Sequence, residues 1–216
     1  MTVRIKIDFV SDVSCPWCAV GLSSLELALA RLDGEIQAEI HFQPFELNPD
    51  MPPEGQDTVE RLARKYNMTP EQVRQNGEAI TARGREVGFT FNMDKRTHTY
   101  NTFDAHRLLH WAHLEGHQLA LKHALLKAYF TDGENPSAPE VLIRLCHESG
   151  LNAQRAREIL GSDEYAADVR ERERFYAKQG VNAVPAIIIN DKHLIQGGQP
   201  PEVFEGALRQ AAGATA

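Results

Sequence analysis

The 216-residue sequence predicts an α/β protein in which both ends of the chain build one mixed β-sheet and the middle forms an all-helical insertion. Apolar residues alternate with polar residues at the start of the chain, which is typical of a strand. A long stretch with helical periodicity follows, and strand character returns in a continuous apolar run over 184–189. A sheet protein whose helices are concentrated in mid-chain indicates a small α/β domain with an inserted helical domain.

The amino-terminal segment predicts a strand, a helix and a second strand. The apolar face of the first strand consists of Val3, Ile5, Ile7 and Phe9. Leucines at helical spacing continue from Leu22 to Leu32, and Gly34 ends this helix. Alternation over 36–43 predicts the second strand, and the proline-rich loop over 44–55 is the first candidate domain boundary.

The middle of the chain predicts a series of helices. Their expected ranges are 58–66, 69–88, 101–115, 118–130, 137–150, 153–160 and 162–180. Gly77 and Gly84 lie on the inner stripe of the second of these helices, where two glycines indicate the close approach of another backbone. We place the helical insertion at 50–161 and the discontinuous sheet domain at 1–49 and 162–216.

The carboxyl-terminal segment predicts a hairpin followed by a last helix. The apolar run over 184–189 is followed by Asn190-Asp191, a pair suited to a tight turn, and 193–195 forms the return strand. A helix begins at Pro200 after two glycines. Short connections favour a parallel pair of strands from the start of the chain and an antiparallel pair from its end.

The sequence Cys15-Pro16-Trp17-Cys18 lies where the first strand passes into the first helix. We expect Ser14 to cap this helix, Cys15 to occupy its first position and Pro16 to fit into its first turn. The positive end of a helix favours a thiolate and so lowers the pKa of Cys15. Cys18 is one turn further on the same face, within reach of a disulfide. We predict that Cys15 is the attacking sulfur and Cys18 the resolving sulfur.

Two other interpretations of this cysteine pair stay open. A C-x-x-C pair is half of many zinc sites, but the remaining cysteine, Cys146, is distant and has no cysteine near it. The two thiols could instead be buried small hydrophobic groups. A redox role is favoured because C-x-x-C beside a strand–helix unit is typical of redox motifs. Trp17, between the thiols, is expected to stay partly exposed and to form an apolar lip for substrates.

Composition limits the classes of partner and compartment. Lysine and arginine number 23 against 30 aspartates and glutamates, a formal net charge of −7 that argues against a nucleic-acid-binding surface. No uncharged apolar stretch has the length of a signal peptide or a membrane span. Three cysteines do not make a structural disulfide framework. We therefore expect a cytoplasmic protein without nucleic-acid or membrane partners.

Several short motifs are distributed over nearly the whole chain. They are Asp8-Phe9-Val10-Ser11-Asp12 before the cysteines, Phe45-x-Leu47-Asn48-Pro49, Asn101-Thr102, Ala105-His106-Arg107-Leu108, Ala128-Tyr129-Phe130, Gly180-Val181 before Val184-Pro185, and Gly197-Gly198-Gln199. With these motifs the sequence resembles the DsbA family of thioredoxin-like disulfide oxidoreductases, and specifically its FrnE-like branch. The resemblance implies a thioredoxin-like sheet, a nucleophilic Cys15, a cis Pro185 beside the cysteines and a helical domain over the site.

The same resemblance extends to residues that would meet a substrate. It implies that the Val184 backbone offers an N–H and a C=O to an extended substrate segment. In the family pattern Asn101, Thr102 and His106 face the site region, and Asn101 and His106 are candidate substrate contacts. Helix capping and hydrogen bonding between domains are the alternative roles of all three residues. Ala186 departs from the pattern, which has a larger or hydroxylated residue there, and this bears on substrate preference.

Other residues invite a functional interpretation. Histidines recur at helical spacing, at positions His106, His110, His113 and His117. A metal stripe is one interpretation, but no carboxylate or cysteine completes a ligand set, so we expect a histidine face and no metal site. Cys146 is expected to be a buried small hydrophobic residue. Asp8 is expected to be a surface charge in preference to a proton relay for Cys18.

The function that these observations favour is thiol–disulfide exchange with protein or peptide substrates through the Cys15–Cys18 dithiol. No cofactor is expected beyond the redox-active disulfide, with glutathione as a candidate co-substrate, and the protein is expected to be a monomer or a homodimer. One alternative is a glutathione-dependent transferase or isomerase of the related kappa-class branch, which has serine at the position of Cys15. Another is a polypeptide-binding chaperone module that uses the apolar groove around Trp17 and Val184.

Overall fold

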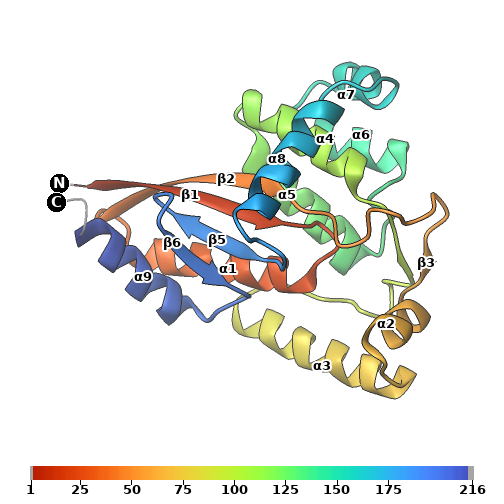
Figure 1. Ribbon diagram of the computed structural model, residues 1–216, viewed down its shortest axis with the longest axis horizontal. Coiled ribbons are helices and arrows are strands. Elements are labelled where there is room, and N and C mark those ends of the chain that lie inside the picture. The colour runs from red at the N-terminus through yellow and green to blue at the C-terminus, as the bar shows by residue number, and fades with distance from the viewer. Residues whose placement is uncertain (1, 214–216) are drawn as a thin grey trace.

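The computed structural model describes residues 2–213 as a four-stranded mixed sheet flanked by helices (Figure 1). Across the sheet the strands are β2 (Ile36–Pro44), β1 (Val3–Ser11), β5 (Ala186–Ile189) and β6 (His193–Gln196). β1 is parallel to β2, whereas β5 is antiparallel to both β1 and β6. The predicted α/β class is confirmed, with a parallel pair from the start of the chain and an antiparallel pair from its end.

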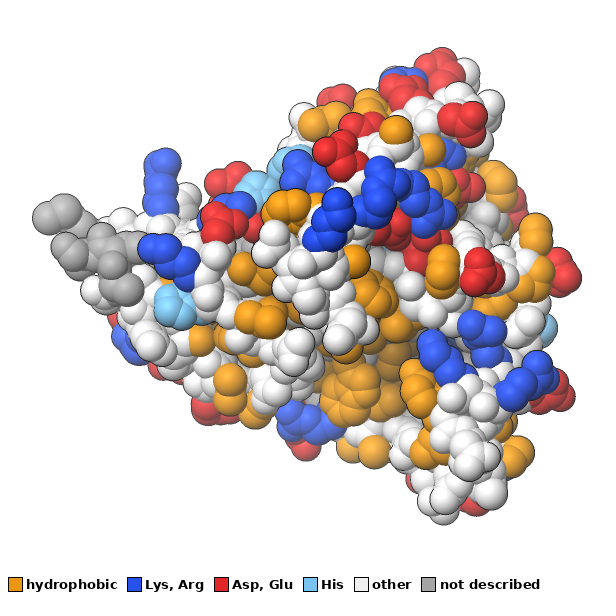
Figure 2. All heavy atoms as spheres, in the orientation of Figure 1, with side chains coloured by type: hydrophobic (Ala, Val, Ile, Leu, Met, Phe, Trp, Pro, Cys, Tyr) orange, Lys and Arg blue, Asp and Glu red, His pale blue; other side chains and the backbone are white. Residues whose placement is uncertain are grey.

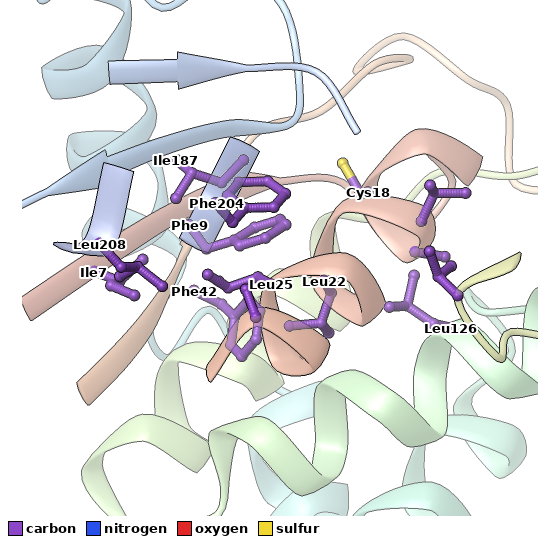
Figure 3. Packing of buried hydrophobic residues seen from close by; sticks show 14 of the residues in the cluster. Ile7, Phe9, Cys18, Leu22, Leu25, Phe42, Leu126, Ile187, Phe204 and Leu208 are labelled. Carbon is purple, nitrogen blue, oxygen red and sulfur yellow. The ribbon is translucent and has the colours of Figure 1, made fainter. Parts of the chain in front are cut away.

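One hydrophobic core joins this sheet to the first and last helices. Helix α1 (Pro16–Arg31) packs against α9 (Pro201–Gly213), which also contacts β1. Figure 3 shows the side chains that meet there: Ile7, Phe9, Leu22, Leu25, Phe42, Ile187, Phe204 and Leu208. The rings of Phe9 and Phe42, on neighbouring strands, lie 5.6 Å apart between centroids. Because Cys18 belongs to this same core, the packing fixes the start of α1 against the end of the sheet.

The opposite face of β1 is covered as well, which corrects the expectation for Asp8. Val10 packs with Tyr176 of helix α8 (Ala166–Lys178) in a separate buried cluster. Asp8 points to this face and is 3% exposed, so it is not a surface charge. Its carboxylate pairs with Lys6 at 2.9 Å and accepts a hydrogen bond from Gln43 at 2.7 Å. Where α8 covers the second face of this central strand, even a polar position such as Asp8 is buried, whereas Arg4 and Lys6 nearer its start stay exposed.

The segment between β2 and β5 is mainly helical, as predicted. Its helices are α2 (Thr58–Tyr66), α3 (Pro70–Glu86), α4 (Phe103–Leu114), α5 (Gln118–Lys127), α6 (Pro139–Glu148), α7 (Ala153–Leu160) and α8. A π-helical turn, Ala128–Asp132, follows α5, where one continuous helix was expected. A two-stranded ribbon that the sequence pattern did not indicate pairs β3 (Gln56–Asp57) with β4 (His98–Thr99).

This helical segment has its own hydrophobic cluster and also packs against the sheet. The cluster includes Leu108, Trp111, Leu121, Leu125 and Leu142, from helices α4, α5 and α6. Helices α4, α5 and α8 contact β2, and α3 contacts α1. The boundaries proposed above, 1–49 and 162–216 against 50–161, stay a prediction. Within residues 2–213, no helix combines the length and the apolar character needed to cross a membrane.

The two glycines of α3 differ in their surroundings, which gives a first testable prediction. A Cβ at Gly84 would lie 2.6 Å from Cε2 of Phe91 and 2.7 Å from the backbone oxygen of Phe89, so the predicted close approach is real there. A Cβ at Gly77 would meet only Met93, at an ordinary 3.8 Å. We expect Gly84→Ala to lower the free energy of unfolding by about 1–3 kcal/mol, measured by urea denaturation. Gly77→Ala is the matched control and should leave stability unchanged or raise it by up to about 1 kcal/mol; equal effects of the two substitutions would contradict the prediction.

Candidate active site

The two cysteines lie at the amino-terminal end of α1, one residue out of the expected register. The helix begins at Pro16, and Cys15 is its N-cap residue with an extended backbone, φ −92° and ψ 114°. Ser14 was expected to cap the helix, but its hydroxyl has no hydrogen-bond partner within the described part of the chain. Instead, the carboxylate of Asp12 accepts a hydrogen bond from the Ser14 N–H at 3.1 Å. The Cys18 N–H donates to the Cys15 carbonyl at 3.1 Å, which holds the cysteines one turn apart.

Both sulfurs are free thiols, and their surroundings shift their pKa values in opposite directions. The hydrogen bond from Cys18 lowers the pKa of Cys15, and it outweighs the opposing effect of burial. Burial, followed by the hydrogen bond to Cys15, raises the pKa of Cys18 well above its ordinary value. Cys15 is 4% exposed and Cys18 is fully buried. The arrangement therefore favours a thiolate on the outer sulfur and keeps the proton on the inner one.

The segment Val184-Pro185 lies directly against the cysteines. Its peptide bond is cis, and the thiol of Cys15 donates to the Val184 carbonyl at 3.7 Å. Pro185 precedes β5, and its own carbonyl accepts a hydrogen bond from Gly197 at 2.9 Å. A Cβ at Gly21 would lie 3.3 Å from the Pro185 ring, so a small residue in α1 lets the helix and this loop meet.

Asp12, His106 and the loop after β2 form a buried polar group beside the cysteines. His106 Nε2 lies 3.1 Å from the Phe45 carbonyl and 3.8 Å from Oδ1 of Asp12. The other carboxylate oxygen of Asp12 accepts from the Leu47 N–H at 2.7 Å. Burial favours a higher pKa for Asp12, but the His106 side chain and the N–H groups of Leu47 and Ser14 lower it overall. Asp12 therefore stays ionised and ties the cysteine loop to the loop after β2.

The candidate substrate contacts divide into two pairs. Trp17 is 39% exposed and Val184 is half-buried, so both present surface at the cysteines. His106 is 3% exposed, and its ring nitrogen faces the main chain. Asn101 accepts a hydrogen bond from the Phe103 N–H at 2.8 Å and donates to the Pro49 carbonyl at 3.1 Å. Asn101 and His106 therefore have the capping and loop-holding geometry that was their alternative role.

A sequence model of the DSBA-like thioredoxin domain matches residues 6–209, nearly the whole chain. The chain belongs to the DSBA-like thioredoxin family. The crystal structure of a probable DsbA oxidoreductase from Streptomyces coelicolor superposes on this one with a TM-score of 0.89, and the two sequences are 34% identical. The match covers 97% of this chain and 90% of that chain. The uncharacterized protein YwbO of Bacillus subtilis is 29% identical over 96% of each sequence. The cytosolic disulfide reductase DsbM of Pseudomonas aeruginosa, solved with GSH, shares the fold, with 18% sequence identity and a TM-score of 0.63. The match covers 95% of this chain and 98% of the DsbM chain.

Family membership and the predicted thioredoxin-like fold are thus established, whereas assignment to the FrnE-like branch stays a prediction. Cys146, expected to be a small hydrophobic residue, is fully buried, and burial raises its pKa to about 12. Among residues 2–213, the histidines at helical spacing included, no three side chains of His, Cys, Asp or Glu form a group that could hold a metal ion.

Two residues of this DSBA-like site were not selected from the sequence. Asp12 appeared only within a family motif, although an acidic residue just before a helix start is a recognisable capping signal. Lys122 in α5 gave no signal, because a lysine on an amphipathic helix is expected at the surface. In the structure Lys122 is fully buried, and burial lowers its pKa while the charges of Cys18, Asp12 and Cys15 oppose that shift.

Proposed function

We propose that the protein is a thiol–disulfide oxidoreductase that acts on protein or peptide substrates through Cys15 and Cys18. The observation that carries this proposal is the pair of free thiols one turn apart at the start of α1, held against the cis Val184-Pro185 segment; their pKa shifts in opposite directions agree with it. A lowered pKa gives Cys15 the thiolate needed to attack a disulfide at neutral pH. A raised pKa keeps Cys18 protonated until the first exchange has taken place.

The proposed exchange proceeds in two nucleophilic steps. The Cys15 thiolate attacks one sulfur of a substrate disulfide, forms a mixed disulfide and releases the first substrate thiolate. Cys18 then loses its proton, attacks the Cys15 sulfur and releases the second substrate thiolate, which leaves a Cys15–Cys18 disulfide. The reverse sequence transfers that disulfide to a substrate dithiol. Glutathione is the proposed thiol that reduces the Cys15–Cys18 disulfide.

An apolar hollow beside the cysteines supports a polypeptide substrate. Figure 2 shows hydrophobic side chains gathered in a hollow at the place where Figure 1 draws the start of α1. Trp17 is the exposed aromatic residue at this end of the helix. Val184 adjoins the Cys15 sulfur through its carbonyl, so an extended peptide could pair with its backbone while its cysteine meets Cys15.

The first test of this substrate surface is Trp17→Ala. Removal of the indole takes away apolar contact area, so we expect KM for a disulfide-bonded peptide to rise about tenfold, with kcat changed much less. Steady-state kinetics with the peptide disulfide measures both constants. Phe175→Ala removes another exposed aromatic side chain, on α8, and is the control that should leave both constants unchanged. An unchanged KM and kcat in Trp17→Ala would show that the indole does not contact the substrate.

The decisive experiment is the redox equilibrium of Cys15–Cys18 with a glutathione buffer, followed by tryptophan fluorescence and combined with a thiolate titration. We expect one reversible intramolecular disulfide and a Cys15 pKa below the ordinary value of about 8.5. A Cys15 thiol that titrates like a free cysteine, or a pair that never forms a disulfide, would refute the proposal.

The variant Cys15→Ser separates the two alternative functions. A glutathione-dependent transferase or isomerase would keep its affinity for glutathione in this variant, since that branch has serine at this position. A chaperone module would continue to suppress aggregation even after both thiols are removed. The proposed oxidoreductase loses its exchange activity in both cases.

The cytoplasmic compartment is part of the same proposal. Three cysteines, two of them in the C-x-x-C pair, fit a protein whose disulfide cycles and does not serve as a structural staple. Cell fractionation with an antibody against the protein tests the compartment, and recovery of the protein outside the cytoplasmic fraction would contradict it.

A further inference from the structure

A small cavity lies between β2 and helices α4, α5 and α8, and both polar and apolar side chains line it. Its volume is about 50 Å³. The titratable and charged side chains that line it are His41, His106, His110, His113, Lys122 and Arg172. About 10–15 Å³ is enough for one water molecule where polar partners are present, so the cavity can hold water.

Lys122 is the innermost cation of this cavity. It is fully buried, and its Nζ has no hydrogen-bond partner among the described residues; it lies 5.5 Å from the centre of the Phe42 ring. A buried ammonium without a partner carries a large desolvation cost, which favours the neutral amine. In agreement with this, burial lowers the pKa of Lys122, while the charges of Cys18, Asp12 and Cys15 oppose that shift.

Lys122 therefore connects the cavity to the core that holds the resolving thiol. The Lys122 Nζ lies over the ring of Phe42, which lines the cavity and also belongs to the same hydrophobic cluster as Cys18. Cys18 needs such a neighbour, because it is fully buried and holds its proton strongly. In a mixed disulfide the substrate would also cover Cys15, which closes the direct approach to Cys18.

We propose that Lys122 exchanges protons with Cys18 during disulfide exchange and that the cavity is its route to solvent. This inference rests on the proposed function. In the resolving step the Cys18 proton passes, through water, to the neutral Lys122 amine. The Cys18 sulfur bonds to the Cys15 sulfur, and the substrate leaves as a thiolate. In the reverse direction the Cys18 thiolate is the leaving group and takes the proton back from the Lys122 ammonium.

The histidines of α4 extend the proposed proton route from the cavity to solvent. Burial lowers the pKa values of both His110 and His113, so these rings are neutral near pH 7 and can accept a proton on one nitrogen. His110 is half-buried and His113 is exposed, so the series ends in solvent. His41 of β2 contacts His113, with ring centroids 5.0 Å apart, and Arg172 of α8 adds a positive charge to the same wall.

The test uses Lys122→Met, which keeps an unbranched side chain of similar length and removes the amine. Reaction with an aromatic disulfide that releases a coloured thiolate shows both steps in one stopped-flow trace, because Cys15 releases the first thiolate and Cys18 the second. At pH 7 we expect the second release to slow by about tenfold to a hundredfold and the first to change by less than about threefold. Lys127→Met alters an exposed lysine of the same helix and should leave both releases unchanged.

The outcomes separate this inference from the function on which it rests. A second release as fast in Lys122→Met as in the unaltered protein overturns the role of Lys122 and leaves the oxidoreductase proposal intact. Two normal releases from the aromatic disulfide, without exchange on any peptide disulfide, would refute the proposed substrate class and leave the role of Lys122 intact.

A measurement on the unaltered protein makes the inference independent of the variant. Oxidation to the Cys15–Cys18 disulfide removes the thiolate charge that stabilises the Lys122 ammonium. The pKa of Lys122, followed by NMR at its Cε, should therefore be higher in the reduced protein than in the oxidised protein. An identical pKa in the two states would overturn the proposal even if the Lys122→Met protein does not fold.

Discussion

Replacing Cys15 by serine is expected to lower the rate of disulfide exchange by about a thousandfold or more, because the hydroxyl supplies no thiolate at neutral pH. The reaction is measured with a disulfide-bonded peptide and excess glutathione. Cys18→Ser should behave differently: its Cys15 still attacks, but the mixed disulfide is not resolved and accumulates. Mass spectrometry of the protein after the reaction detects this adduct.

Cys146→Ala is the control for this pair of variants. Cys146 is fully buried away from the site, and its pKa of about 12 leaves it protonated at neutral pH. The substitution should therefore leave the exchange rate unchanged within about twofold, since it touches no reacting group. Substantial exchange by Cys15→Ser, or loss of exchange in Cys146→Ala, would show that the attacking sulfur has been assigned wrongly.

Phe9→Ala is expected to lower the free energy of unfolding by about 3–5 kcal/mol, the largest stability effect that we predict. Phe9 is fully buried in the central strand, where Figure 3 shows it facing Phe204 and Ile187. Its ring also packs against Phe42 of the neighbouring strand. Alanine would leave a cavity at the contact between the sheet and both covering helices. Urea denaturation followed by circular dichroism measures the change.

An exposed phenylalanine provides the matched control. Phe175 of α8 is about half exposed, so Phe175→Ala should change the free energy of unfolding by no more than about 0.5 kcal/mol. A loss below about 1 kcal/mol in Phe9→Ala would mean that the core collapses around the gap or that the strand is not held as the structure shows. Since whole domains are stable by only about 5–15 kcal/mol, the expected loss is a substantial part of the total.

Local patterns were sufficient to predict most of the fold. The alternation in β1, the leucine spacing in α1 and the apolar run of β5 each correspond to an element of the structure. The capping box at the start of α3 is also present, with Thr69 and Gln72 bonded to each other's backbone. These features depend on residues close together in the sequence, which is why they can be recognised there.

The differences arise where distant segments meet. Asp8 is buried because α8 covers its side of β1, and no local pattern indicates which helix covers that face. Lys122 is buried because α5 packs on β2 with that side inward. The N-cap residue is Cys15, where Ser14 was expected, because the Ser14 N–H donates a hydrogen bond to the Asp12 carboxylate. Leu47 and His106 hold that carboxylate in place. In each case the deciding contact joins parts of the chain that are far apart in sequence.

The order of strands in the sheet also constrains how the protein can be synthesised. β1 lies between β2 and β5, but β5 begins only at Ala186. At about 5–20 residues per second, a ribosome needs on the order of ten seconds to proceed from β2 to β5. During that interval one edge of the central strand has no partner, and an unpaired edge is a template for aggregation. The nascent chain, and not the finished protein, is therefore the form in which this sheet most needs protection.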